Sequence, residues 1–236
     1  MFFLSGGYGL FFLLSLPALI LGLWAQAKVR SAFNKYSKVR NMLGMTGAEV
    51  ARKILMANQL SNIKIEETSG FLSDHYDPVK KVLRLSPDIF KSNSIAAAGV
   101  AAHEVGHALQ DQGGYFPLQL RTFLVPTVQI GSWLGPIIFF LGMLLAPSIG
   151  TNLAWIGLIL FGFTAIFTLI TLPVELDASR RAKAWLLNSG MIYPSEINGV
   201  NSVLDAAAWT YVAAAIQAIT TVMYYALILM GRPRRN

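Results

Sequence analysis

The sequence contains no cysteine, so disulfide bonds and thiolate metal ligands are both excluded. Any metal that the chain binds must therefore use nitrogen and oxygen donors. Histidine is scarce, with only three in 236 residues. Charge is also low, because only 13% of the residues are charged against about 25% in soluble proteins. The lack of cysteine fits a reducing compartment such as the cytoplasm.

Hydrophobic residues make up 54% of the chain and are concentrated in blocks, which is typical of a protein with several membrane spans. Four blocks have about 20 residues or more, enough to cross a hydrocarbon core about 30 Å thick. They lie at about Phe2–Trp24, Phe123–Pro147, Asn152–Pro173 and Ala206–Met230. The first lacks the basic segment and cleavage site of a signal peptide, so we expect it to be a retained span. The sequence therefore predicts four transmembrane helices.

The basic residues predict the orientation of these spans. Sixteen of the 19 Lys and Arg residues lie in Ala25–Arg121 and Glu175–Asp205, which two spans separate and which therefore share one side. The positive-inside rule places that side in the cytoplasm. The tail Gly231–Asn236 has three arginines that would lie outside, and we expect the sixteen to outweigh them. The net charge of +7 does not indicate nucleic-acid binding, because no basic-aromatic pattern accompanies it; the expected partner is the lipid bilayer.

The polar stretch after the first block predicts a helix and two strands. A capping box at Thr46–Glu49 opens the helix. Its apolar face is expected to comprise Val50, Ile54, Leu55 and Met56. Short strands are expected at Asn62–Ser69 and Lys81–Ser86, and the segment Ser73–Pro78 between them has the residues of a turn.

A second helix is expected to start near Ser92 or Ser94, to end at Gly113, and to carry the segment His103-Glu-Val-Gly-His107. Residues four apart share one helix face, so both imidazoles can reach one metal ion. Glu104 lies about 100° around the helix. It is therefore beside the ion, where it can take a proton from an activated water. This HExxH arrangement is that of zinc peptidases, and we predict one Zn²⁺ per chain with Glu104 as catalytic acid and base.

A catalytic zinc ion usually has three protein ligands and a water. The third ligand is expected where the third span returns to the same side, and Pro173 there suits the first turn of a new helix that continues to Asn188. Glu175 and Asp177 lie about 200° apart on that helix, so only one can face the ion. We choose Glu175 because it is nearer the membrane, and assign Asp177 a supporting position. Three side chains are candidates to contact the substrate or transition state: His75, Tyr76 and Arg180.

The predicted fold class is mainly α, with four transmembrane helices and a small α+β zincin-like cytoplasmic portion. The corresponding division is as follows: 1–24, first transmembrane helix; 25–122, zincin-like part with the motif helix; 123–174, transmembrane hairpin; 175–205, cytoplasmic helix with the third ligand; 206–236, fourth transmembrane helix and basic tail.

The chain resembles the YugP-like family of bacterial membrane zinc metallopeptidases. The resemblance covers nearly the whole chain and depends on four segments: Leu72–Pro78, Lys81–Ser86, Ser94–His107 and Pro173–Ala182. It implies a neutral zinc peptidase of the bacterial cytoplasmic membrane that acts on polypeptides. It also implies the same three metal ligands and the same catalytic glutamate.

The chain is similar, more distantly, to the HtpX and CAAX prenyl protease group. That group has a Glu-x-x-Ala-Asp motif, and here Glu175 is followed by Ser179 where the aspartate would stand. The glutamate transfers, but the supporting acidic role does not. In zincins generally, a strand ahead of the motif helix binds the substrate backbone by strand addition, and Val82–Leu85 is the matching position.

Two other readings remain open at this point. In a site-2-type intramembrane protease the motif helix would lie in the bilayer, but Ile95–Leu109 is shorter than the roughly 20 residues that a span needs. In a catalytically inactive, zinc-stabilised membrane scaffold, four protein ligands would close the site. His75 is the only other histidine available for that.

Overall fold

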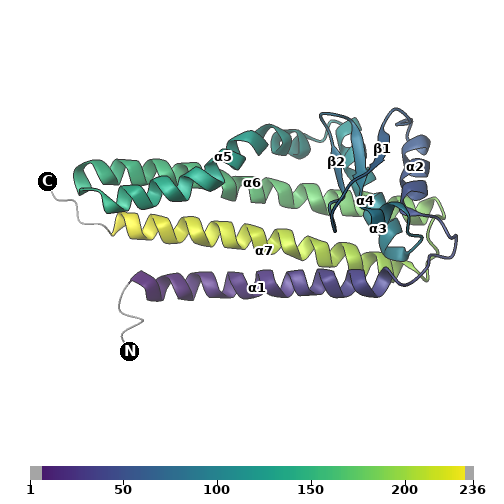
Figure 1. Ribbon diagram of the computed structural model, residues 1–236, viewed down its shortest axis with the longest axis horizontal. Coiled ribbons are helices and arrows are strands. Elements are labelled where there is room, and N and C mark those ends of the chain that lie inside the picture. Colours follow the sequence, from purple (N-terminus) through teal and green to yellow (C-terminus); the bar gives the residue numbers. More distant parts are fainter. Residues whose placement is uncertain (1–6, 232–236) are drawn as a thin grey trace. The chain divides into compact units, whose positions relative to one another are not determined.

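The computed structural model describes residues 7–231 of the chain. As predicted, it is mainly helical with a small sheet (Figure 1). The elements follow in the order α1 (Gly7–Tyr36), α2 (Gly47–Ala57), β1 (Lys64–Glu67), β2 (His75–Asp77), β3 (Val82–Leu85), α3 (Pro87–Phe90), α4 (Ile95–Gln112), α5 (Phe116–Leu144), α6 (Pro147–Asn188) and α7 (Ile197–Met230). Their contacts divide the chain into two compact units. The first comprises Met1–Trp24, Leu120–Leu172 and Thr210–Asn236. The second, the motif unit, comprises Ala25–Gln119 and Pro173–Trp209.

Three described helices are long and apolar enough to cross a membrane: Phe116–Leu144, Ser148–Asn188 and Ile197–Met230. Helix α1 is not among them. Its predicted span begins at Phe2, outside the described residues, so the fourth span stays a prediction. The basic tail at 232–236 also lies outside the described residues.

Glycines bring α5 and α6 together within the first unit. A Cβ atom added to Gly142 would lie 2.4 Å from the backbone nitrogen of Ala154, and one added to Gly157 would lie 2.3 Å from that of Phe139. Small residues that let helix backbones approach closely are typical of interfaces between membrane helices. The two helices therefore pack closely against each other within this unit, and the transmembrane hairpin at 123–174 stays a prediction.

The prediction that a new helix begins at Pro173 is wrong. Helix α6 runs without a break from Pro147 to Asn188, with Pro173 inside it. Proline removes one hydrogen bond and strains the preceding turn, but long helical segments on both sides can absorb that cost. The expected C-terminal end is confirmed, because Gly190 follows it with φ 65°.

In the motif unit, the capping box that opens α2 is confirmed. The hydroxyl of Thr46 accepts from the amide of Glu49, and a carboxylate oxygen of Glu49 accepts from the amide of Thr46 at 2.7 Å. Val50, Ile54 and Leu55 are buried as expected, whereas Met56 is 59% exposed and does not belong to the apolar face.

The sheet has the strand order β1-β3-β2, with β1 parallel and β2 antiparallel to β3. The strands β1 and β3 were expected, but β2 lies in the segment Ser73–Pro78 that we interpreted as a turn. That segment does contain turn chemistry, because Asp77 accepts from the amides of Val79 and Lys80, and the strand ends there. Because β3 is central and paired on both sides, Val82–Leu85 cannot bind a substrate by strand addition. That expectation is wrong.

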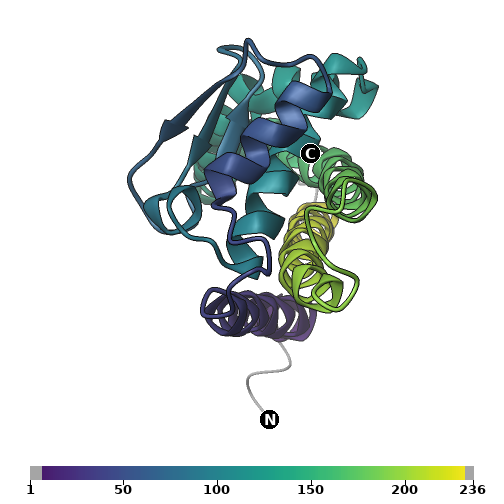
Figure 2. The ribbon, with the colours of Figure 1, turned by 90° about the vertical axis from the view of Figure 1, so that its right-hand side faces the viewer.

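The two faces of the sheet differ, as strand alternation requires. Tyr76, Leu83 and Leu85 are buried in the core that α2 and α4 also form. Figure 2 shows the ribbons of α2 and α4 beside the sheet. The opposite face is polar and carries Glu66, His75, Asp77 and Arg84. Helix α4 starts with Ser94 as its N-cap and is buried almost throughout. The helix of the motif is therefore a core element of this unit.

Candidate metal centre

The three predicted ligands lie together in the motif unit. Nitrogen atoms of His103 and His107 and a carboxylate oxygen of Glu175 all lie within 4.8 Å of one another. His107 and Glu175 are buried, and the side chain of His103 is 13% exposed. The histidines come from one face of α4 and the glutamate from α6.

A close helix crossing brings these residues together. A Cβ atom added to Gly106 would lie 2.5 Å from the backbone oxygen of Ala178, so α4 and α6 touch there through their backbones. This glycine therefore serves the packing of the two helices. As a consequence, the candidate ligands on either side of the crossing can meet.

The donor set fits Zn²⁺. The Nε2 atoms of His103 and His107 lie 3.1 and 3.5 Å from Oε2 of Glu175. Tetrahedral coordination with bonds of about 2.0–2.1 Å places neighbouring donor atoms about 3.3 Å apart. Two imidazole nitrogens and one carboxylate oxygen leave the fourth position of a tetrahedron free, which is the pattern of catalytic zinc sites.

The other nitrogen of each imidazole contacts an oxygen, as metal-binding histidines usually do. Nδ1 of His103 lies 3.0 Å from the hydroxyl of Ser179, and Nδ1 of His107 lies 3.0 Å from Oε1 of Gln110. Both contacts turn Nε2 toward Glu175. Neither of these two contacts was predicted from the sequence. Their spacing offered a signal, because Ser179 follows Glu175 by four residues and Gln110 follows His107 by three.

Glu104 lies beside this cluster and is buried. Its Oε2 accepts a hydrogen bond of 3.1 Å from the backbone amide of Tyr76 on β2. Burial raises the pKa of Glu104 to about 7, and the carboxylate of Glu175 adds to the rise, while His103 opposes it. A group that titrates near neutrality can both accept and return a proton.

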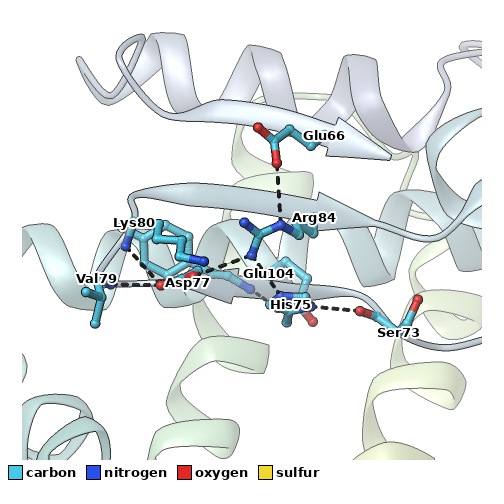
Figure 3. A network of polar contacts seen from close by, with 9 residues as sticks. Glu66, Ser73, His75, Asp77, Val79, Lys80, Arg84 and Glu104 are labelled. Atoms are coloured by element: carbon cyan, nitrogen blue, oxygen red, sulfur yellow. Dashed lines mark hydrogen bonds and ion pairs between the residues drawn. The ribbon is translucent and has the colours of Figure 1, made fainter. Parts of the chain in front are cut away.

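The three candidates for substrate contacts are engaged elsewhere in the described structure. His75 donates through Nδ1 to the backbone oxygen of Ser73 and accepts through Nε2 from the guanidinium of Arg84 (Figure 3). The hydroxyl of Tyr76 donates to Asp111, and burial raises its pKa, so it stays protonated. The side chain of Arg180 is 79% exposed and pairs with Asp177. Of the three, Tyr76 comes nearest to Glu104, through its backbone amide rather than its side chain.

Asp177 is linked to the candidate ligand His107 through one intermediary side chain, that of Gln110. Its Oδ2 accepts from Nε2 of Gln110 at 3.0 Å, and Gln110 in turn contacts His107. Arg181 also donates to Oδ2, at 2.6 Å. The supporting position that the sequence predicted for Asp177 stays a prediction, and the structure adds Gln110 as the residue between Asp177 and His107.

Comparison with known proteins agrees with this geometry. Residues 11–230 match the model of a family described as "putative neutral zinc metallopeptidase". The chain belongs to this zinc peptidase family. It is also 48% identical over 227 residues to the "putative membrane protease YugP" of Bacillus subtilis, which covers 96% of this chain and all of the relative. No solved structure matches. The family match spans every residue of the cluster described above.

The chain differs at one position from the HtpX and CAAX prenyl protease group, to which it is more distantly similar. In that group an aspartate follows the third ligand by four residues, and in this chain Ser179 has that position. The hydroxyl of Ser179 contacts His103 directly. The supporting contact to the imidazole is thus made by a neutral oxygen.

Proposed function

We propose that this protein is a membrane-bound zinc metalloendopeptidase of the HExxH-plus-Glu type, with one Zn²⁺ held by His103, His107 and Glu175. The observation that carries the proposal is the convergence of these three donors within 4.8 Å, with the buried carboxylate of Glu104 beside them. Family membership supports the reaction class. The apolar helices and the relative's description as a membrane protease support the location.

The side chains have separate tasks in peptide-bond hydrolysis. When bound, Zn²⁺ supplies a Lewis acid that polarises the scissile carbonyl and makes a water acidic. The carboxylate of Glu104 takes a proton from the attacking water and returns it to the leaving amine. The amide of Tyr76 holds one oxygen of Glu104, which leaves the other oxygen for the water. Burial of Glu104 keeps bulk water from competing for the proton.

The sheet supports an extended polypeptide as the substrate. Strand β2 is an edge strand, and its Tyr76 contacts Glu104. A chain segment that adds to an edge strand is held by its backbone, so it is selected for being extended more than for its sequence. We therefore propose a membrane-associated or unfolded protein at the cytoplasmic face as the substrate. The proposed topology has four spans, with the motif unit as its zincin-like cytoplasmic portion.

The two rival functions have less support. The helix that carries the motif, α4, is not one of the three candidate spans among the described residues, which disfavours an intramembrane protease. An inactive zinc scaffold would need a fourth protein ligand. The candidate metal group among residues 7–231 has three members, and His75 is bonded to Ser73 and Arg84 instead.

The decisive experiment compares the wild type with Glu104→Gln. We expect the purified variant to bind zinc as the wild type does and to lose hydrolysis of an unfolded test protein by at least about 100-fold, because general acid-base catalysis contributes about 10²–10⁴. Ser61→Ala, on the exposed surface of the same unit, is the control and should keep full activity. In membranes, natural substrates should accumulate with Glu104→Gln. Equal hydrolysis by the variant, or a wild type that binds no zinc, would refute the proposal.

A further inference from the structure

The most completely buried polar side chain next to the cluster is that of Gln110. Its exposed fraction is 0%, yet all of its polar atoms have partners. Nε2 lies 2.7 Å from the backbone oxygen of Val174 and 3.0 Å from Oδ2 of Asp177. Oε1 lies 3.0 Å from Nδ1 of His107. A buried amide with every bond satisfied has a single orientation.

The packing of α4 on α6 explains why Gln110 reaches these partners. Contacts between the two helices run in opposite directions along the chain: His103 meets Ser179, His107 meets Glu175, and Gln110 meets Val174. The helices are therefore antiparallel at this crossing. Gln110 lies one turn beyond the backbone contact at Gly106, where the gap has opened enough for a side chain.

The partners of Gln110 determine where the proton of His107 lies. A backbone carbonyl and a carboxylate only accept hydrogen bonds, so the NH₂ group of the amide must face Val174 and Asp177. The amide oxygen then faces His107 and can only accept. Nδ1 of His107 must therefore be the donor in this contact. Nε2 also faces an acceptor, the carboxylate of Glu175, but at 3.5 Å against 3.0 Å for the amide oxygen, so in a neutral ring the shorter contact keeps the proton on Nδ1 and the lone pair on Nε2. Ser179 does not impose such a choice on His103, because a hydroxyl can donate or accept.

We propose that Gln110 is a positioning residue that fixes His107 in the Nδ1–H tautomer and so presents its Nε2 lone pair to the metal before the metal arrives. This inference rests on the proposed metal site. Asp177 holds the amide in its orientation, and Arg180 and Arg181 pair with Asp177. The guanidinium of Arg181 also lies 5.9 Å from the centroid of the Tyr115 ring, which fixes its position. The orientation of the His107 ring thus depends on contacts that run from Gln110 to Asp177 and Arg181 on α6.

The direct test is nitrogen NMR of the metal-free full chain, labelled at histidine and held in detergent micelles at about pH 8, above the ordinary histidine pKa of about 6.5. The sequence has only three histidines, so the spectrum is simple, and His107→Gln identifies the signals of His107. We expect the proton of His107 on Nδ1 in the wild type. A proton on Nε2 would overturn the proposal, and this result needs neither zinc nor activity.

Variants separate the hydrogen bond from packing. Gln110→Leu removes the acceptor, so we expect the Nδ1–H preference to be lost and zinc affinity, measured by chelator competition, to fall by about 10- to 100-fold. Gln110→Glu keeps an acceptor for Nδ1–H, but it loses the bond to Val174, and its second oxygen must carry a proton to face the carboxylate of Asp177. This variant should therefore retain the tautomer and regain part of the affinity that Gln110→Leu loses. Gln112→Leu, on the same helix, loses only a bond to the backbone of Asn58 and should change neither quantity.

Two results would contradict a positioning role: equal losses in Gln110→Leu and Gln110→Glu, or an unchanged tautomer and affinity in Gln110→Leu. If Gln110→Leu does not fold, the wild-type spectrum and Gln110→Glu still decide the question. Failure of the proposed function is distinguishable, because it would show as retained hydrolysis in Glu104→Gln while the tautomer of His107 stayed as expected.

Discussion

At the scale of single residues, Gly106 is the position where the candidate metal centre depends most directly on backbone packing. Its Cα faces the carbonyl oxygen of Ala178, and that oxygen belongs to a helix that cannot swing aside as a side chain would. The proposed ligands His103 and His107 flank Gly106 on one helix, and the proposed ligand Glu175 lies less than one turn from Ala178 on the other. A small separation of α4 from α6 at this point would therefore pull the carboxylate away from both imidazoles.

We predict that Gly106→Ala destabilises the motif unit by about 1–3 kcal/mol, the usual cost of overpacking, and weakens zinc binding. Alanine would gain about 1 kcal/mol of helix propensity, but its Cβ would lie 2.5 Å from the oxygen of Ala178, so the clash outweighs the gain. Thermal unfolding of the purified protein and chelator competition measure the two effects.

Gly99→Ala on the same helix is the matched control. Its Cβ would lie 3.4 Å from Cγ1 of Val200, an ordinary contact, so the same gain in propensity meets no clash. The melting temperature of Gly99→Ala should therefore stay level or rise. Equal behaviour of the two alanine variants would show that the crossing at Gly106 is not tight in solution.

At the scale of secondary-structure elements, the N-terminus of α2 is held by a pair of reciprocal bonds between Thr46 and Glu49. Hydrogen bonds from the backbone and side chain of Thr46 lower the pKa of Glu49. A carboxyl whose pKa is lower in the folded than in the unfolded state stabilises the fold above the unfolded pKa of about 4.3. That stabilisation is lost as the pH falls through the lowered pKa of the folded state.

We predict that Thr46→Ala costs about 1 kcal/mol of local stability, so that amides of α2 that exchange by local opening do so about fivefold faster. Glu49→Gln should also speed exchange at pH 7, and its effect relative to the wild type should shrink as the pH falls through the lowered pKa of Glu49 in the folded state and disappear below it. Hydrogen–deuterium exchange of the α2 peptide measures both changes, with Ser61→Ala as the control. A penalty for Glu49→Gln that persists at acid pH would contradict the electrostatic part of this argument.

Elements that follow from local chemistry could be predicted from the sequence, and those that depend on tertiary contacts could not. The capping box of α2 and the start of α4 at Ser94 are determined by residues that are close together in the sequence. Strand β2 has only three residues among turn-forming ones, and it exists because β3 pairs with it. Pro173 favours a helix start by propensity, whereas the long helix around it decides otherwise.

The same distinction applies to the candidate site. The four-residue spacing of His103 and His107 was enough to predict that both lie on one helix face. Glu175 was predicted as the third ligand from its position after a span. The contacts of Gln110 and of the backbone amide of Tyr76 could not be predicted, because each joins two elements. Gln110 on α4 bonds to Val174 on α6, and Tyr76 on β2 bonds to Glu104 on α4. Sequence patterns within one helix identify ligands, while the groups that orient ligands come from helix and strand packing.

At the scale of the whole molecule, the absence of cysteine makes the proposed topology directly testable, because any introduced cysteine is the only thiol. Lys64→Cys on β1 and Ser189→Cys after α6 are at exposed positions and should be protected from a membrane-impermeant thiol reagent in intact cells. Ser148→Cys in the first turn of α6 should react without permeabilisation, and so should Ser5→Cys if the first block spans the membrane. Permeabilised cells, in which all four should react, are the control. A reactive Lys64→Cys in intact cells would place the motif unit outside the cell. That result would contradict the orientation that the sixteen basic residues predict by the positive-inside rule.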